Sequence, residues 1–149
     1  MIDKIWVYIE CPAWSFLVNC GYWLFHIHQI KGALAEKKKI KARCRTLVAV
    51  RLELAMFEWK KDSLKDWTPW VITIINNNFR DDCDGAAVYG RWLLKNIGIK
   101  SKILHLRGKT GHDVCVTADK KWMVSNDTLA DISGKDVLEY FNGKYKTII

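Results

Sequence analysis

Residues 83–97 most constrain what this chain can fold into, because they combine a helical period with a face of small side chains. The members at three- or four-residue spacing are Cys83, Ala87, Gly90, Leu94 and Ile97. This spacing places them on one side of a helix. Gly98 supplies the left-handed stop that ends such a helix. Small residues permit close approach, so we expect this side to pack on another element.

Three segments after this helix alternate between residue types as strands do, at 103–106, 112–118 and 122–125. Glycine-rich or charged turns separate them. Successive side chains of a strand point to opposite faces, so His112 and Asp113 should lie on different sides. The order predicts an antiparallel meander behind a helix, which is an α+β fold.

The length of the chain predicts one domain. With 149 residues, half of them hydrophobic, the chain is long enough for one core, and two domains would each be undersized. Within residues 1–149 we expect two regions, an aromatic and basic helical region at 1–66 and the helix-and-sheet core at 67–149.

Residues 11–30 carry no formal charge, and a helix of this length is long enough to span a bilayer. Polar residues such as Asn19 and His28 would need partners in hydrocarbon, so we expect a buried aromatic helix rather than a membrane span. The apolar period between Leu34 and Trp59 fits one long helix or two.

Three polar or turn-forming positions organise the next stretch. Asp66 or Thr68 can cap a short helix that begins near Pro69 and runs through Ile75. The three asparagines at 76–78 should then turn the chain, because their side chains compete for backbone hydrogen bonds.

The net charge of +8 is concentrated between residues 31 and 51, where eight basic residues face one acidic residue. The positions that define this basic patch are Lys37, Lys38, Lys39, Lys41, Arg43 and Arg45. Such a patch can attract nucleic acid or an acidic protein, although a solvated helix face has the same composition.

The five cysteines are odd in number, widely spaced and without a C-x-x-C pair. This pattern argues against a disulfide framework or a structural zinc site. The first residues lack the pattern of a secretory signal. We therefore expect a cytoplasmic protein without a metal or other cofactor.

Cys83, His112 and Asn126 follow one another in the order nucleophile, base and orienting amide. Amides at a helix start favour a thiolate, and a cationic imidazole would favour it further. The neighbouring aspartates oppose this effect. Asn126 could orient the imidazole, and Asp127 is the alternative third member.

The motifs around these residues resemble those of the bacterial and phage transglutaminase-like cysteine proteinases. The matching segments are Asp-Cys-Asp-Gly-Ala-Ala at 82–87, Leu-Leu-Lys-Asn-Ile-Gly-Ile at 93–99, Gly-His-Asp-Val-Cys-Val at 111–116 and Lys-Trp-Met-Val-Ser-Asn at 121–126. The resemblance covers residues 67–127. It implies a papain-like core in which Cys83, His112 and Asn126 form the catalytic triad, and a cytoplasmic site of action, which for a phage protein is the host cytoplasm.

This family chemistry predicts attack by the Cys83 sulfur on a peptide or amide carbonyl, with a thioester intermediate. The Cys83 backbone amide, with the side chain of Asn77 or Asn78, is the expected oxyanion site. The substrate would be a peptide or protein. The alternative is a catalytically inactive homologue that uses the basic patch to bind nucleic acid or an acidic partner.

Overall fold

The computed structural model describes residues 2–61 and 68–148. The chain folds as α+β, with most helices in its first two thirds and a five-stranded antiparallel sheet in its last third. The helices are α1 (Ile2–Phe25), α2 (Ile27–Arg43), α3 (Leu47–Leu54), α4 (Val71–Asn76), α5 (Cys83–Asn96) and α6 (Val137–Tyr140).

The strands form two sheets. The small one pairs β1 (Glu58–Trp59) in parallel with β2 (Arg80–Asp81). The large one contains β3 (Ser101–Gly108), β4 (Gly111–Thr117), β5 (Trp122–Ser125), β6 (Thr128–Asp131) and β7 (Tyr145–Ile148), in the order β6-β5-β4-β3-β7. The predicted meander is therefore confirmed, and two strands and a helix follow it.

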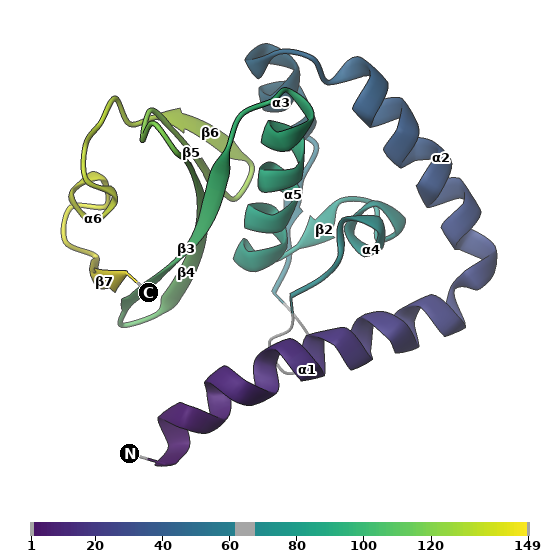
Figure 1. The fold of residues 1–149 in the computed structure, drawn as a ribbon, viewed down its shortest axis with the longest axis horizontal. Coiled ribbons are helices and arrows are strands. Elements are labelled where there is room, and N and C mark those ends of the chain that lie inside the picture. Colours follow the sequence, from purple (N-terminus) through teal and green to yellow (C-terminus); the bar gives the residue numbers. More distant parts are fainter. Residues whose placement is uncertain (1, 62–67, 149) are drawn as a thin grey trace.

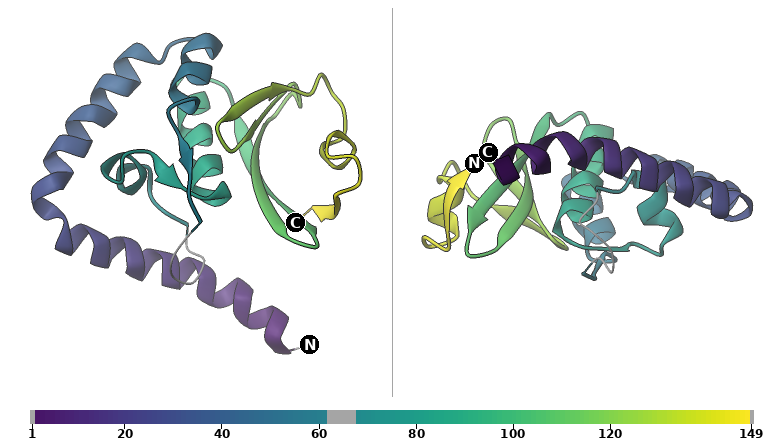
Figure 2. Two further views of the ribbon diagram at one scale, coloured as in Figure 1. Left: turned by 180° about the vertical axis from the view of Figure 1, so that it is seen from behind. Right: turned by 90° about the horizontal axis from the view of Figure 1, so that it is seen from below.

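Helix α5 lies between the sheet and α2, while α1 and α2 make two sides of an open frame (Figure 1). Figure 2 shows the same frame from behind, with α5 inside it and the sheet beyond. The frame has its corner at His26, whose Nδ1 lies 2.9 Å from the carbonyl oxygen of Tyr22. The stretch predicted as one helix or two is two helices, α2 and α3.

The small face predicted for α5 packs on the sheet. Gly90 is the closest point, since an added Cβ would lie 2.6 Å from Cγ1 of Val124. Cys115 and Val124 share the core under α5, whereas Val114 and Met123 belong to a second cluster on the other face of the sheet. The period of two therefore assigned both faces of β4 correctly.

The first core also draws on residues before position 67, including Ile40 and Leu54, both fully buried. Glu53 is buried there too, and it accepts two hydrogen bonds from the guanidinium of Arg43, at 2.5 and 3.0 Å. This bidentate pair joins the end of α2 to α3.

The prediction of a buried aromatic helix near the N-terminus is wrong for the residues whose side chains are described. Phe16, Leu17, Leu24 and Phe25 on α1 are exposed. The sequence predicted burial because it lacks charge there, but several of the α1 side chains that the structure describes face solvent. A lack of charge does not by itself supply a partner surface.

Among the α1 side chains that the structure describes, Ser15 and Asn19 are buried, Asn19 fully. Nδ2 of Asn19 donates to the carbonyl oxygens of Ser15 and Thr68, and its Oδ1 accepts from the amide of Trp70 and the hydroxyl of Thr73. The short helix predicted after Pro69 is present as α4, but its N-cap residue is Trp70 rather than Thr68. The other predicted cap, Asp66, lies outside the described residues.

Candidate functional site

Cys83 is the first residue of α5, as predicted, and Asp82 is the N-cap residue. The Asp82 carboxylate accepts a hydrogen bond of 3.1 Å from the amide of Asp84. The Cys83 side chain is partly buried. The sequence therefore located the helix start correctly, and of the two aspartates that could cap this helix, Asp81 and Asp82, the structure uses Asp82.

The surroundings of the thiol do not favour a thiolate. Burial, together with the carboxylates of Asp82, Asp113 and Asp84, raises the pKa of Cys83 to about 11, against a backbone hydrogen bond from Asp113 that lowers it. The thiol is thus protonated at neutral pH. The expected stabilisation of the sulfur anion by the helix start is outweighed by burial and by negative charge.

His112 is the second residue of β4, and its imidazole contacts three side chains. Nε2 lies 2.9 Å from Oγ of Ser125. The ring stacks on Tyr145 at 5.7 Å and meets the edge of Phe141 at 5.7 Å. Burial lowers the pKa of His112, so the ring is neutral at pH 7. The expectation of a cationic imidazole beside the sulfur is therefore wrong.

The partner of His112 is Ser125, which corrects the prediction of Asn126 or Asp127 as the third member. Asn126 follows the end of β5 with a φ of 51°, and its Oδ1 is buried with no hydrogen-bond partner among the described residues. Asp127 instead accepts a hydrogen bond from the hydroxyl of Thr128. In the parts of the chain that the structure describes, neither of these two side chains forms a hydrogen bond with the imidazole.

The structure brings the backbone of β4 to Cys83 but turns the imidazole to the other face. The backbone amide of Asp113, which donates a hydrogen bond to the thiol, belongs to the peptide group that joins Asp113 to His112. Tyr145, on which the ring stacks, belongs to the core cluster across the sheet from α5. Among the described residues, no hydrogen bond joins the thiol to the imidazole. Nδ1 of His112 likewise has no hydrogen-bond partner there.

The predicted oxyanion donors are not both available. Nδ2 of Asn77 donates a 2.7 Å hydrogen bond to the carbonyl oxygen of Arg80 within the turn. Asn78 holds that turn with a φ of 56°. The Asn77 side chain therefore has a role in the turn, and the Asn78 side chain stays a predicted oxyanion donor. The Cys83 amide lies in the first turn of α5, where amides lack helical partners.

A second imidazole lies on the face of the sheet that α5 covers. Nδ1 of His105 is 2.8 Å from Oδ1 of Asp113, and the two residues are directly paired across β3 and β4. His105 is not among the predicted site residues. The signal that finds it is the hairpin register, which becomes predictable once the turn before Gly111 is placed.

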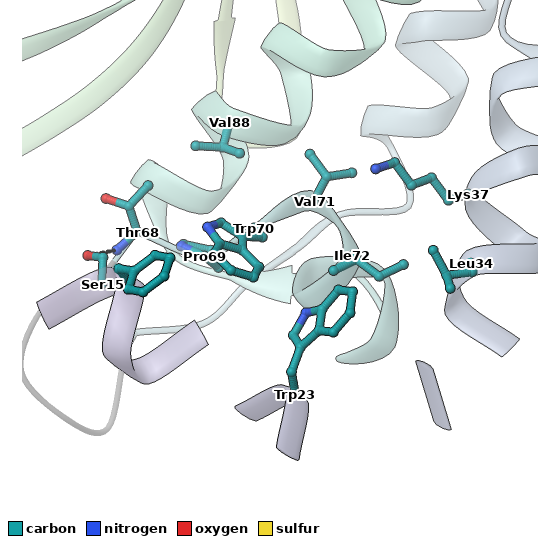
Figure 3. A pocket seen from close by; sticks show the side chains of 11 residues that line it. Ser15, Trp23, Leu34, Lys37, Thr68, Pro69, Trp70, Val71, Ile72 and Val88 are labelled. Carbon is teal, nitrogen blue, oxygen red and sulfur yellow. Dashed lines mark hydrogen bonds between the residues drawn. The ribbon is translucent and has the colours of Figure 1, made fainter. Parts of the chain in front are cut away.

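Two cavities lie beside these residues. The polar cavity, of about 400 Å³, is lined by Thr68, Asp84, Val88, Arg91, Lys102, Ile103, His105 and Asp113. The apolar cavity, of about 660 Å³, lies between α1, α2 and α4 (Figure 3).

Burial and the neighbouring carboxylates of Asp82 and Asp81 raise the pKa of Asp84 far above its usual range. The Asp84 side chain is therefore a neutral acid at pH 7.

Asp81, Asp82 and Asp84 bring carboxylate oxygens within 4.8 Å of one another. Such a group can hold a divalent cation. Two of the carboxylates are already engaged locally, because Asp81 accepts from the amide of Asp82 and Asp82 accepts from the amide of Asp84. The helix start also presents positive charge, which disfavours a cation.

The basic patch on α2 is partly neutralised. Arg43 binds Glu53 and Glu36, and Lys39 lies 3.6 Å from Glu36. The ammonium of Lys37 lies 5.8 Å from the ring centre of Trp92. Within residues 2–61 and 68–148, the members of the patch without an ion pair or ring contact are Lys38, Lys41 and Arg45, all exposed.

No family model, curated protein or solved structure matches the chain. Among the helices that the structure describes, none has the length and apolar character needed to cross a membrane.

Proposed function

We propose that the protein is a transglutaminase-like cysteine hydrolase acting on peptide or amide bonds, with a papain-like core, Cys83 as nucleophile and His112 as general base. Ser125 takes the orienting role that was expected of Asn126. The observation that supports this most is the Asp113 amide at the thiol, because it places the chain of His112 directly against the start of α5.

The hydrogen bond between Nε2 of His112 and Ser125 supports the same proposal. It engages one ring nitrogen and leaves Nδ1 for proton transfer, which is the division of roles that a catalytic triad requires. The imidazole must turn from its contacts with Phe141 and Tyr145 to bring Nδ1 within hydrogen-bond reach of the sulfur. Because His112 and Asp113 point to opposite faces of β4, the proposal includes a rearrangement of the backbone at the start of β4, together with the imidazole, when substrate binds.

The pKa shifts favour general-base catalysis over a preformed ion pair. A neutral imidazole accepts the thiol proton as the sulfur bonds to the carbonyl carbon. The amine then departs with that proton, leaving a thioester on Cys83. Water hydrolyses the thioester and releases the acid and the free thiol. The Cys83 amide at the helix start is placed to donate to the oxyanion.

Labelling of the cysteines between pH 6 and pH 10, followed by mass spectrometry, tests the proposal. Cys20 is the internal control because it is also a free, partly buried cysteine. Because the Cys83 thiol is protonated and the imidazole is turned away at rest, we expect iodoacetamide alone to label Cys83 no faster than Cys20. A peptidyl chloromethyl ketone, which occupies the substrate position as it alkylates, should label Cys83 faster than Cys20, and His112→Ala should remove that difference while His28→Ala leaves it. Equal rates at the two cysteines with the peptidyl reagent, unchanged by His112→Ala, would refute the assignment.

A second candidate is an inactive homologue that binds a polyanion through the basic patch. The protonated, partly buried thiol and the exposed Lys38, Lys41 and Arg45 favour it. Retention on heparin should then weaken when Lys38 and Lys41 are changed to Gln, with Lys135→Gln as the control. No retention at low salt would exclude this candidate.

A further inference from the structure

The two cavities adjoin at Thr68 and Val88, which line both of them. The apolar cavity lies on one side of these two residues, and the polar cavity lies on the other. Their volumes of about 660 and 400 Å³ fall in the range of about 300–1,000 Å³ common for ligand sites. One extended molecule can therefore occupy both.

The polar cavity borders the candidate nucleophile. Asp84, the residue after Cys83, lines it. Asp113 lines the polar cavity too, and its backbone amide is hydrogen-bonded to the Cys83 thiol. A chain lying in the polar cavity therefore passes beside the first turn of α5, where the sulfur and the unpaired helix amides are found.

Aromatic side chains give the apolar cavity its character. Trp70 meets the edges of Phe16 at 5.9 Å and Trp23 at 6.0 Å. Ile72 and Leu34 face the same space from α4 and α2 (Figure 3). Phe16 is 57% exposed and Trp70 is 38% exposed, so part of this aromatic surface is left uncovered by the residues that the structure describes.

The segment between the cavities is held in place before any ligand binds. Ser15 Oγ accepts a 2.9 Å hydrogen bond from the amide of Thr68, and Asn19 binds the Thr68 carbonyl oxygen and the Trp70 amide. A wall fixed in this way lowers the ordering cost of binding.

The polar cavity carries excess positive charge. Arg91 and Lys102 line it, and neither has an ion pair within the described parts of the chain. Asp113 is already engaged by His105, and Asp84 is a neutral acid because burial raises its pKa. Electrostatic complementarity therefore favours a ligand with a carboxylate at this position.

From these observations, and resting on the proposed function, we propose that the two cavities form one groove for an extended peptide substrate. A bulky aromatic or aliphatic side chain of the peptide occupies the cavity at Phe16 and Trp70. A carboxylate of the same peptide lies at Arg91 and Lys102.

The test is binding of end-blocked, fluorescein-labelled hexapeptides to the full chain carrying Cys83→Ala, measured by fluorescence anisotropy. Each set compares a peptide with Phe and Glu against its Phe→Ala, Glu→Gln and doubly changed versions. The Phe and Glu are separated by one to four residues in different sets. Cys83→Ala keeps every peptide intact during the measurement.

We expect one spacing at which the Phe and Glu peptide binds about tenfold more tightly than either singly changed peptide, from apolar burial and charge pairing. Arg91→Gln should remove the preference for Glu over Gln, while Lys95→Gln on the same helix leaves it. Phe16→Ala should reduce the preference for Phe over Ala. Circular dichroism of each variant verifies that it is folded.

Equal binding of the versions at every spacing, or no binding at about 1 mM peptide, would overturn the proposal. A dimer in sedimentation that Phe16→Ala dissociates would overturn it too, because a second copy would then occupy the groove. Selective binding without His112-dependent labelling of Cys83 by the peptidyl reagent would refute catalysis and support the groove. Such labelling of Cys83 without peptide selectivity would refute only the groove.

Discussion

Replacing Asn19 by Ala should be among the most destabilising single changes in the helical region. Its amide makes four hydrogen bonds, at 2.7 and 3.0 Å as donor and 2.9 and 3.1 Å as acceptor. The side chain is fully buried. Truncation leaves the Thr68 carbonyl, the Trp70 amide and the Thr73 hydroxyl without the partner that joins them to α1.

The size of the effect follows from these contacts. A hydrogen bond contributes about 0.5–1.5 kcal/mol net, and a buried polar group left unpaired costs about 1–3 kcal/mol. For Asn19→Ala we expect a loss of about 3–5 kcal/mol in the free energy of unfolding. At about 2–4 °C per kcal/mol for a chain of this size, the melting temperature should fall by about 10 °C.

The assay is denaturation in guanidinium chloride, with circular dichroism as the signal and the slope of the transition compared between variants. Gln29→Ala is the matched control, because Gln29 is exposed and makes one hydrogen bond of 3.3 Å. Its expected cost is below about 0.5 kcal/mol. A cost for Asn19→Ala equal to that of the control would show that the polar cluster does not anchor α1.

Three further predictions use the same measurement. Glu53→Gln should lower the free energy of unfolding by about 2 kcal/mol, less than the loss of a fully buried ion pair, because the guanidinium that Glu53 binds is half-exposed. Glu36→Gln should lower it by under about 1 kcal/mol. Equal losses would contradict the role of burial. Gly90→Ala should lower the free energy of unfolding by about 1–3 kcal/mol, because the added Cβ meets a side chain of β5. Gly32→Ala, whose Cβ would meet no described atom within 4 Å, should raise the free energy of unfolding by about 1 kcal/mol. An increase at both positions would refute the close approach. Because the pKa of Asp84 is raised in the folded protein, the unfolded chain loses this proton at a lower pH than the folded protein does. The free energy of unfolding should therefore fall as the pH rises above about 4, and Asp84→Asn should flatten this decline between pH 4 and pH 8. An unchanged pH profile in Asp84→Asn would refute the raised pKa.

Much of the local structure around the candidate site could be predicted. The Asp82 cap, the start of α5 at Cys83 and the faces of β4 all follow from spacing and capping preferences. The partner of His112 could not be predicted in this way. Choosing Ser125 over Asn126 depends on where β5 ends and on the left-handed turn that follows it.

The sequence by itself determined the period of each element and hence which side chains share a face, because these properties depend on residues a few positions apart. The tertiary structure decided the state of the site. The pKa of Cys83 depends on burial by residues that are distant in the sequence and on Asp113. The exposure of Phe16 depends on which described residues pack against its part of α1. Burial, long-range charge and cavities arise only when remote segments pack, so no local pattern encodes them.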